Sequence, residues 1–274
     1  MNAQTSATEA SWSPIIDTHA HLFEQDLPLA ANASWLPPYS FTKEQYLDLL
    51  DKESILFGVI TAPSFLGTYN DHTLAMLRST PRLRGTAIVD PDIDSSALRA
   101  LADGGIVGIR YSLRRYPDLP DFSAPEYQRL LRRLRDLDLY VHILAESERL
   151  AHLIPHLDKA GVKLVIDHFG VPEKKFGDND PAQSAILQAV QNGKTWIKLS
   201  APYRTAGVEM AALAQKFLAA AGPERLLWGS DCPWTGHEGK YTLRDTVRWF
   251  EEWIPDRAIR EQIGRSGLAL NKFI

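Results

Sequence analysis

The chain has 274 residues, a formal net charge of −4 and one cysteine, Cys232. This length accommodates one large hydrophobic core and is close to the roughly 250 residues of an eightfold β/α barrel. The small negative charge argues against a general attraction to nucleic acid or to anionic membranes, and a lone cysteine excludes an internal disulfide.

The polar start, Met1–Ser13, lacks the basic and apolar regions of a signal peptide, and no apolar run approaches the roughly 20 residues that cross a bilayer. We therefore expect a cytoplasmic protein with one domain at residues 14–274 and a disordered tail at residues 1–13. These features leave open whether the chain forms a homo-oligomer.

The first apolar run, Ile15–Leu22, becomes polar at every second position, with Asp17, His19 and His21. Alternate side chains of a strand share a face, so these three are predicted to point the same way. Two imidazoles at this spacing can offer two nitrogens to one metal ion or one substrate. Either histidine alone could equally make an ordinary hydrogen bond, so the function depends on what the other strands bring to the same place.

The next segment, Phe23–Phe41, has no helical period and is predicted to be an ordered functional loop. Thr42 then looks like the N-cap of a helix that runs to about Lys52, because Gln45 completes a capping box three residues later.

Apolar runs and helical patterns alternate through the rest of the chain. Further strands are predicted at residues 54–61, 83–89, 105–111, 139–144, 162–168, 195–200 and 225–231. Further helices are predicted at residues 71–79, 95–102, 124–137, 147–160, 181–191, 207–220 and 242–253. Strands separated by helices pair in parallel, and eight such units favour an α/β fold, a single-domain (β/α)8 TIM barrel. An open doubly wound sheet competes, but no glycine-rich phosphate loop follows the first strand.

A β/α barrel carries its chemistry at the carboxyl ends of its strands. The polar residues predicted there are His19, His21, Ser64, Arg110, His142, His168, Lys198, Ser200 and Asp231. Helices and loops hold the other four histidines, which we interpret as surface or packing residues: His72, His152, His156 and His237. This coincidence of imidazoles and one carboxylate favours a functional site over a set of unrelated polar residues.

Asp231 and Arg110, together with the neighbouring Cys232, can be interpreted further from the sequence. Asp231 ends an apolar run before Pro233, so it is a candidate metal ligand or general base, or else a cap on the following loop. Cys232 should point to the opposite face and is not interpreted as a nucleophile. Arg110 lies inside an apolar strand, where an unpaired charge is costly, so it must be paired or directed at an anion.

Four motifs together resemble a known family. They are D-T-H-A-H at 17–21, V-H-I-L at 141–144, I-D-H-F-G at 166–170 and L-W-G-S-D-C-P at 227–233. From about Ile15 to Ile274 the chain resembles the amidohydrolase superfamily, in its amidohydrolase-related (type 2) branch. It is most similar to the group of 2-pyrone-4,6-dicarboxylate lactonases, sulfomuconolactone hydrolases and sugar lactonases. The resemblance implies a distorted barrel and a hydrolase that opens the ring ester of a small carboxylated or sulfonated lactone.

The resemblance also implies roles for individual residues. Asp231 would be the general base toward water, and the scissile carbonyl would be surrounded by His19, His21 and His168. Positions that hold the substrate's carboxylates are matched by Ser64, Arg110, Arg204 and one arginine of the Arg114/Arg115 pair, for which we take Arg115. A guanidinium suits this role, because its paired N–H groups bind a carboxylate or sulfonate through charge-assisted bonds.

Two positions depart from the dicarboxylate lactonases. Leu144 replaces a tyrosine, which puts the dicarboxylate substrate itself in question. His142 falls where metal-using relatives, such as the amino-carboxymuconate semialdehyde decarboxylases, place a ligand, whereas the lactonases work without metal. Two forms of the site therefore stay open, one metal-free and one with a zinc ion held by His19, His21, His142 and Asp231.

Three alternatives to a lactone hydrolase also remain open. They are a zinc-dependent non-oxidative decarboxylase of the same superfamily, a lactone isomerase and a binding barrel without enzymatic activity.

Overall fold

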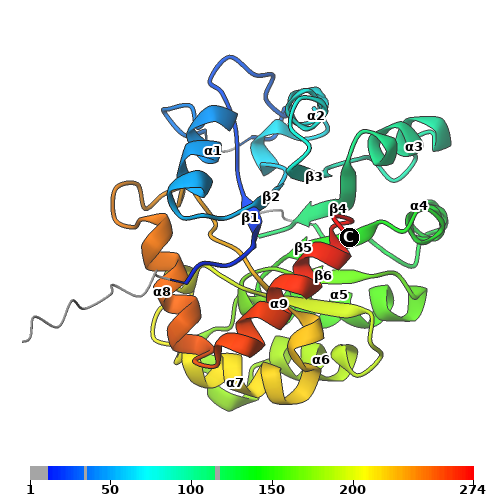
Figure 1. Cartoon of the computed structure of the whole chain (residues 1–274). Coiled ribbons are helices and arrows are strands. Elements are labelled where there is room, and N and C mark those ends of the chain that lie inside the picture. Colours follow the sequence, from blue (N-terminus) through cyan, green and yellow to red (C-terminus); the bar gives the residue numbers. More distant parts are fainter. Residues whose placement is uncertain (1–11, 34–35, 115–117) are drawn as a thin grey trace, which may run out of the picture.

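The computed structural model describes residues 12–33, 36–114 and 118–274. Within these ranges, eight parallel strands form one sheet in the order β1 to β8, and helices surround it (Figure 1). The strands are β1 Ile16–Ala20, β2 Phe57–Ile60, β3 Leu83–Ala87, β4 Ile106–Ser112, β5 Tyr140–Leu144, β6 Leu164–Ile166, β7 Thr195–Leu199 and β8 Leu226–Trp228. The predicted (β/α)8 barrel is thereby confirmed, while the predicted tail lies largely outside the described residues.

The helices follow the strands in the predicted alternation. They are α1 Lys43–Lys52, α2 Asp71–Arg78, α3 Ser95–Asp103, α4 Pro125–Asp136, α5 Ser147–Ala160, α6 Pro181–Val190, α7 Met210–Ala221, α8 Leu243–Trp253 and α9 Arg257–Leu270. Short 3₁₀ turns lie at Ser64–Leu66 (η1), His168–Gly170 (η2), Lys174–Asn179 (η3), Pro202–Arg204 (η4) and Pro223–Arg225 (η5). No helix in the described ranges has the length and apolar character needed to cross a membrane.

Local sequence signals account for where several helices begin. The predicted capping box of α1 is confirmed, because the Thr42 hydroxyl accepts from the Gln45 N–H and the Gln45 side chain accepts from the Thr42 N–H. A second capping box, Thr42-like in pattern, begins α8 at Thr242 and Asp245. These caps satisfy N–H groups that the first helical turn leaves without partners.

Helix α9 has no counterpart among the predicted elements. In Figure 1 it crosses the face of the barrel turned toward the viewer. Its residues Leu268 and Leu270 pack into a buried cluster with residues near the amino ends of several strands, including Ile16, Val107 and Leu227. Helix α9 therefore closes the amino end of the barrel, and the polar strand ends lie at the opposite, carboxyl end.

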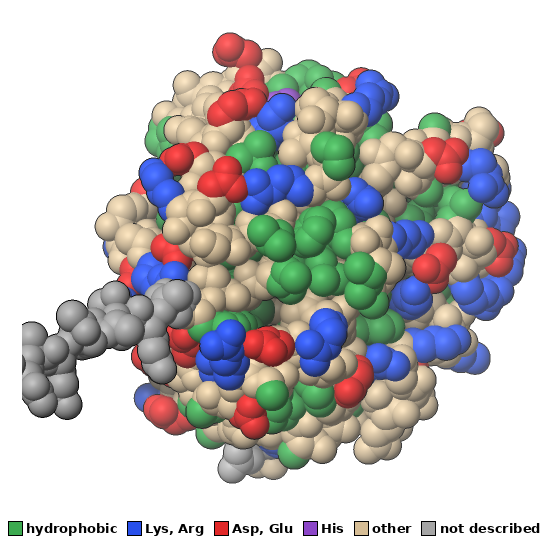
Figure 2. Space-filling model, in the orientation of Figure 1, with side chains coloured by type: hydrophobic (Ala, Val, Ile, Leu, Met, Phe, Trp, Pro, Cys, Tyr) green, Lys and Arg blue, Asp and Glu red, His purple; other side chains and the backbone are tan. Residues whose placement is uncertain are grey.

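The face seen in Figure 2 carries apolar side chains near its centre and both signs of charge around them. Exposed large apolar residues of the described chain are Ile15, Leu29, Leu56 and Ile274.

The barrel closes where β1 meets the segment after β8. The Asp231 N–H donates to the His19 carbonyl at 2.8 Å, and the His21 N–H donates to the Cys232 carbonyl at 2.8 Å. Asp17 adds a side-chain clasp, because its carboxylate accepts from the N–H of Ser230 at 2.8 Å and from the hydroxyl of Ser230 at 2.6 Å. These bonds hold the two strand-one histidines directly beside Asp231.

The sequence prediction that Asp17 shares a face with His19 and His21 is wrong. The register between β1 and β2 shifts between Asp17 and Ala20, which interrupts the alternation of side chains. Asp17 instead accepts a hydrogen bond from the hydroxyl of Tyr46 in α1 at 3.1 Å. Its carboxylate is fully buried and serves the closure of the barrel.

We expect Asp17→Ala to lower the free energy of unfolding by about 3 kcal/mol or more, because it leaves the buried N–H groups of His19 and Ser230 without their acceptor. Urea unfolding monitored by circular dichroism measures the change. The control is Asp48→Ala, an exposed carboxylate of α1 that pairs with Lys52, for which a change within about 0.5 kcal/mol is expected. Equal losses in the two variants would contradict the role of the clasp.

Candidate active site

Three polar atoms converge at the carboxyl end of the barrel. The Nε2 atoms of His19 and His21 lie 3.2 Å apart, and Asp231 Oδ1 lies 3.5 Å from the first and 3.4 Å from the second. All three side chains are buried or nearly so. His21 Nδ1 lies 2.9 Å from the Thr61 carbonyl, to which it must donate, so its Nε2 carries the lone pair that faces the site.

The two oxygens of Asp231 have different environments. Oδ2 accepts from the Tyr203 hydroxyl at 2.6 Å and from Arg204, whose Nε and Nη2 lie 2.8 and 2.7 Å away. Oδ1 has no hydrogen-bond partner within the described part of the chain and faces His19, His21 and His168. One oxygen is thus anchored, and the other is free to accept a proton or a cation.

Burial alone would raise the pKa of Asp231, but Arg204 and the neighbouring imidazoles of His168 and His21 hold that pKa well below its usual range. The imidazoles shift in the opposite sense. Burial lowers the pKa of His168 to about 4 and that of His19 well below 6.5. At neutral pH the site therefore contains an ionised carboxylate among neutral imidazoles.

The backbone turns sharply where these groups leave the strands. His168 and Asp231 have φ values of 49° and 59°, in the left-handed region that favours glycine. Strands β6 and β8 end at Ile166 and Trp228, two and three residues earlier than these side chains. His168 is then oriented by the Ser200 hydroxyl, 2.8 Å from its Nδ1.

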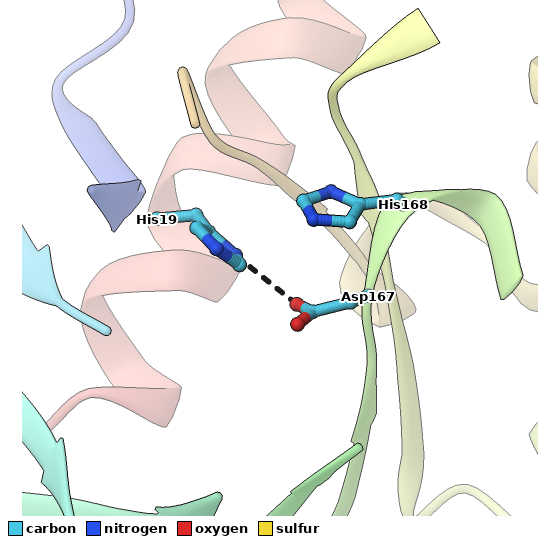
Figure 3. Close-up of side chains that lie close together, drawn as sticks. All are labelled: His19, Asp167 and His168. Atoms are coloured by element: carbon cyan, nitrogen blue, oxygen red, sulfur yellow. Dashed lines mark ion pairs between the residues drawn. The ribbon is translucent and has the colours of Figure 1, made fainter. Parts of the chain in front are cut away.

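A second layer of charge lies beneath the mouth, centred on Asp167. Figure 3 shows His19 pointing to Asp167, with His168 beside them; the His19 Nδ1 to Asp167 Oδ1 distance is 3.1 Å. The same carboxylate is in hydrogen-bond contact with His142 Nε2. Lys198 Nζ lies 3.6 Å from Oδ1, and Arg110 Nη2 lies 3.5 Å from Oδ2.

This layer is fully buried, and burial shifts the pKa values of its titratable side chains. Burial lowers the pKa of His142 to about 3 and that of Lys198 to about 8, with Asp167 opposing both shifts. Burial alone would raise the pKa of Asp167, but His142, His19 and Lys198 hold it well below its usual range. Asp167 is thus the common counter-charge of the lower layer.

The structure describes three of the four residues that were predicted to bind the substrate. Arg110 is buried as expected for a paired guanidinium, and its Nη1 donates to the Ala62 carbonyl at 2.6 Å. Arg204 is bonded to Asp231, and 21% of its side chain is exposed. Ser64 begins η1 directly after β2, at the carboxyl end of the barrel. Arg115 lies outside the described residues.

The four predicted metal ligands are not all brought together. His19, His21 and Asp231 form a group whose ligand atoms lie within 4.8 Å of one another, while His142 is bonded to Asp167 in the layer below. The donor chemistry of the upper group fits a divalent ion, because two imidazole nitrogens and a carboxylate oxygen that lacks a hydrogen-bond partner among the described residues point at one place.

Two residues that contact the site were not predicted from the sequence. Asp167 stands beside His168 in the motif I-D-H-F-G, and Tyr203 stands beside Arg204. Adjacency to a candidate residue was the available signal for both. Neither could be chosen from strand alternation, since each contacts the site from a turn after its strand.

The long loop predicted at residues 23–41 is anchored at both ends. Phe23 and Phe41 pair as an isolated antiparallel bridge, and the Ala30 N–H donates to the Phe65 carbonyl at 2.9 Å. The Tyr39 hydroxyl donates to Glu238, in the loop after β8, at 3.0 Å. The loop therefore reaches across to the segment that carries Asp231.

A family model of the amidohydrolases matches residues 16–266, and the chain therefore belongs to the amidohydrolase family. Among proteins of assigned activity, a 4-sulfomuconolactone hydrolase from Rhizobium radiobacter is 28% identical over 90% of this chain and 86% of its own. A D-galactarolactone isomerase from Agrobacterium fabrum is 25% identical over 90% of this chain and 87% of its own. The crystal structure of a probable 2-pyrone-4,6-dicarboxylic acid hydrolase from Acinetobacter baumannii, with citric acid bound, is 32% identical, has a TM-score of 0.88, and covers 95% of this chain and 100% of its own.

The depressed pKa values of His142 and His168 predict a loss of stability in mild acid. In the unfolded chain these histidines have a pKa near 6.5 and become protonated below that pH, whereas in the folded site they stay neutral. The free energy of unfolding therefore falls as pH drops below 6.5. Between about pH 7 and pH 5 the two residues together should lower the free energy of unfolding by about 4 kcal/mol. Burial raises the pKa of Asp17 to about 6, so the folded protein binds this proton more readily than the unfolded chain. Over the same range Asp17 should therefore increase the free energy of unfolding by about 1 kcal/mol.

Urea unfolding of chelator-treated protein across this pH range measures the effect. His142→Asn should show a shallower slope, because one of the two groups no longer titrates. A free energy of unfolding that stays constant from about pH 7 to about pH 5 would contradict the assignment of neutral, buried imidazoles.

Proposed function

We propose that this protein is a hydrolase that opens the ring ester of a small anionic lactone. The observation that carries the proposal is the environment of Asp231, whose Oδ2 is anchored and whose Oδ1 is bare among three imidazoles. This is the arrangement required to take a proton from a water held beside a carbonyl. Relatives named for lactone hydrolysis and lactone isomerisation support the substrate class.

In this reaction Oδ1 of Asp231 accepts a proton from the attacking water, and the resulting oxygen nucleophile adds to the ring carbonyl. His19, His21 and His168 line the same space, so their N–H or lone-pair edges orient the carbonyl and the water. When the ring C–O bond breaks, the proton on Asp231 is available to the leaving oxygen. The products are a carboxylate and a hydroxyl group on one open chain, and the new carboxylic acid releases one proton to solvent.

The anionic character of the substrate is inferred from the guanidinium groups. Arg110 is buried beside the site, and Arg204 lies at its mouth with part of its side chain exposed. We propose both as anchors for a carboxylate or sulfonate, together with Ser64 and Arg115. The Acinetobacter neighbour was crystallised with citric acid, a carboxylate-rich anion, which agrees with this assignment. Leu144, in place of the expected tyrosine, argues for a lactone other than the pyrone dicarboxylate.

The metal-loaded form of the site is proposed to involve His19, His21 and Asp231, without His142. A bound zinc ion would supply Lewis acidity toward the carbonyl and the water. The tautomer of His19 distinguishes the two forms. If Nδ1–H donates to Asp167, the Nε2 lone pair faces the site and suits a metal; if Lys198 donates to Nδ1, Nε2–H can donate to His21 and no metal is needed.

Of the alternatives, lactone isomerisation is supported by the similarity to a protein named as a lactone isomerase. Hydrolysis adds one water to the substrate, whereas isomerisation leaves its mass unchanged. Decarboxylation had His142 as its main support, and that residue is bonded to Asp167 rather than to the upper group. A cytoplasmic location stays a prediction from the sequence, and the oligomeric state stays open.

Asp231→Asn should lower kcat for a carboxylated or sulfonated lactone by about 100-fold to 10,000-fold, because the amide cannot accept the proton of water. Mass spectrometry of the product, with a pH-indicator assay for rate, measures hydrolysis directly. Asp256→Asn is the matched control, since Asp256 caps α9 far from the site and asparagine caps equally well. Full activity of Asp231→Asn would contradict the proposed base.

Arg204→Gln should move the acid limb of the kcat/KM profile to higher pH. Arg204 holds the pKa of Asp231 low, so removing its charge raises that pKa, and the base becomes protonated at a pH where the wild-type residue is still ionised. Arg204→Lys keeps a charge and should shift the limb less. An unchanged acid limb in both variants, with only KM increased, would show that Arg204 binds substrate without tuning Asp231.

A further inference from the structure

Beside the upper group of ligand atoms lies a second one. His19, Asp167 and His168 also bring three possible ligand atoms within 4.8 Å of one another, and Figure 3 shows the three side chains converging. The two groups share the ring of His19, whose Nε2 faces His21 and whose Nδ1 faces Asp167. Binding of two ions at once therefore requires His19 as a bridging imidazolate, with its N–H proton released to solvent. By its donors alone, this second group could hold a divalent cation as readily as the first.

The second group already has a resident cation. Lys198, from β7, places its Nζ 3.3 Å from His19 Nδ1 and 3.6 Å from Asp167 Oδ1, the same two atoms that form the ion pair in Figure 3. A third contact, 3.1 Å to His142 Nε2, completes its surroundings. The lysine side chain is 1% exposed, so water cannot take over these contacts.

The charges around Asp167 agree with this arrangement. Its carboxylate has the Lys198 ammonium on one oxygen and the Arg110 guanidinium on the other. The negative charge that a second metal ion would require is therefore already compensated. A dication placed against His19 Nδ1 and Asp167 would also lie beside an ammonium in a buried, water-poor environment, where like charges repel strongly.

We propose that Lys198 occupies the second cation position of this site with its ammonium group and so limits the site to one divalent ion. Lys198 is on this proposal a positioning residue, because it acts through His19 and Asp167 and does not touch the substrate. The proposal concerns the metal form of the site described above, but it does not depend on the reaction that the site catalyses. A lysine that served only to neutralise Asp167 would affect stability without affecting how many ions bind.

The experiment counts ions in the purified protein. Wild type, Lys198→Ala and Lys198→Gln are stripped with chelator and dialysed against Mn²⁺, and bound manganese per chain is measured by elemental analysis. Wild type is expected to bind one equivalent, and both variants are expected to bind two, a twofold gain. Lys198→Gln keeps most of the side chain's packing and serves if Lys198→Ala does not fold.

Three control variants locate the ions. Lys194→Ala removes an exposed lysine that bonds the Gly161 carbonyl just before β7, and it should keep the wild-type count. In the Lys198→Gln background, His168→Ala should remove the second ion and His21→Ala the first, since each residue belongs to only one group. Addition of Mn²⁺ should also raise the melting temperature of Lys198→Gln/His21→Ala, a readout independent of activity.

The outcomes separate this proposal from the proposed metal form. If wild type binds no manganese but Lys198→Gln binds one ion that is lost with His168→Ala, Lys198 blocks the second position and the metal-loaded wild-type site is wrong. If folded Lys198→Ala and Lys198→Gln bind no more manganese than wild type, the proposal is overturned. Two ions in wild type would overturn it as well.

Discussion

The site depends on the junction at which the barrel closes. Two backbone hydrogen bonds link the segment of His19 and His21 to that of Asp231 and Cys232, residues about 210 positions apart in the chain. Because each bond ties a candidate residue or its neighbour, the spacing between the imidazoles and the carboxylate is set by main-chain geometry. Asp17 reinforces the junction through Ser230 and links it to α1 through Tyr46. The bonds that complete the fold are thus the same bonds that assemble the site.

Electrostatics divide the site into two layers with different tasks. In the upper layer, Arg204 and Tyr203 saturate one oxygen of Asp231 and leave the other available. In the lower layer, Asp167 gathers His19, His142, Arg110 and Lys198 around one carboxylate. His19 spans both layers, since its two ring nitrogens face Asp231 and Asp167 respectively. The proton position on this one ring therefore links the buried charges to the mouth.

The sequence predicted the barrel well because the fold follows from alternation of apolar and amphipathic segments, which local patterns record. It predicted Asp17 wrongly because one irregularity in the pairing of β1 with β2 reverses which face a side chain takes. His168 and Asp231 could be chosen as strand-end residues, but their direction could not, since it arises from positive φ values beyond the last paired residue. Helix α9 was missed because no strand follows it, and Asp167 because its role arises only from partners on four other strands.

The pKa shifts of Asp231 and the imidazoles limit the catalytic roles that these groups can take. Asp231 is held ionised and is therefore a weak base, while the imidazoles are held neutral and carry no positive charge toward a carbonyl. A weak base removes a proton from water effectively only if the water or the carbonyl is polarised by a second group. Within the described residues, that group can be a guanidinium, an imidazole N–H whose tautomer is fixed from below, or an ion held by the upper ligands. The tautomer of His19, and with it the ability of this ring to bind an ion, depends on the lower layer, so Asp167, His142 and Lys198 influence the chemistry of the mouth without contacting the substrate.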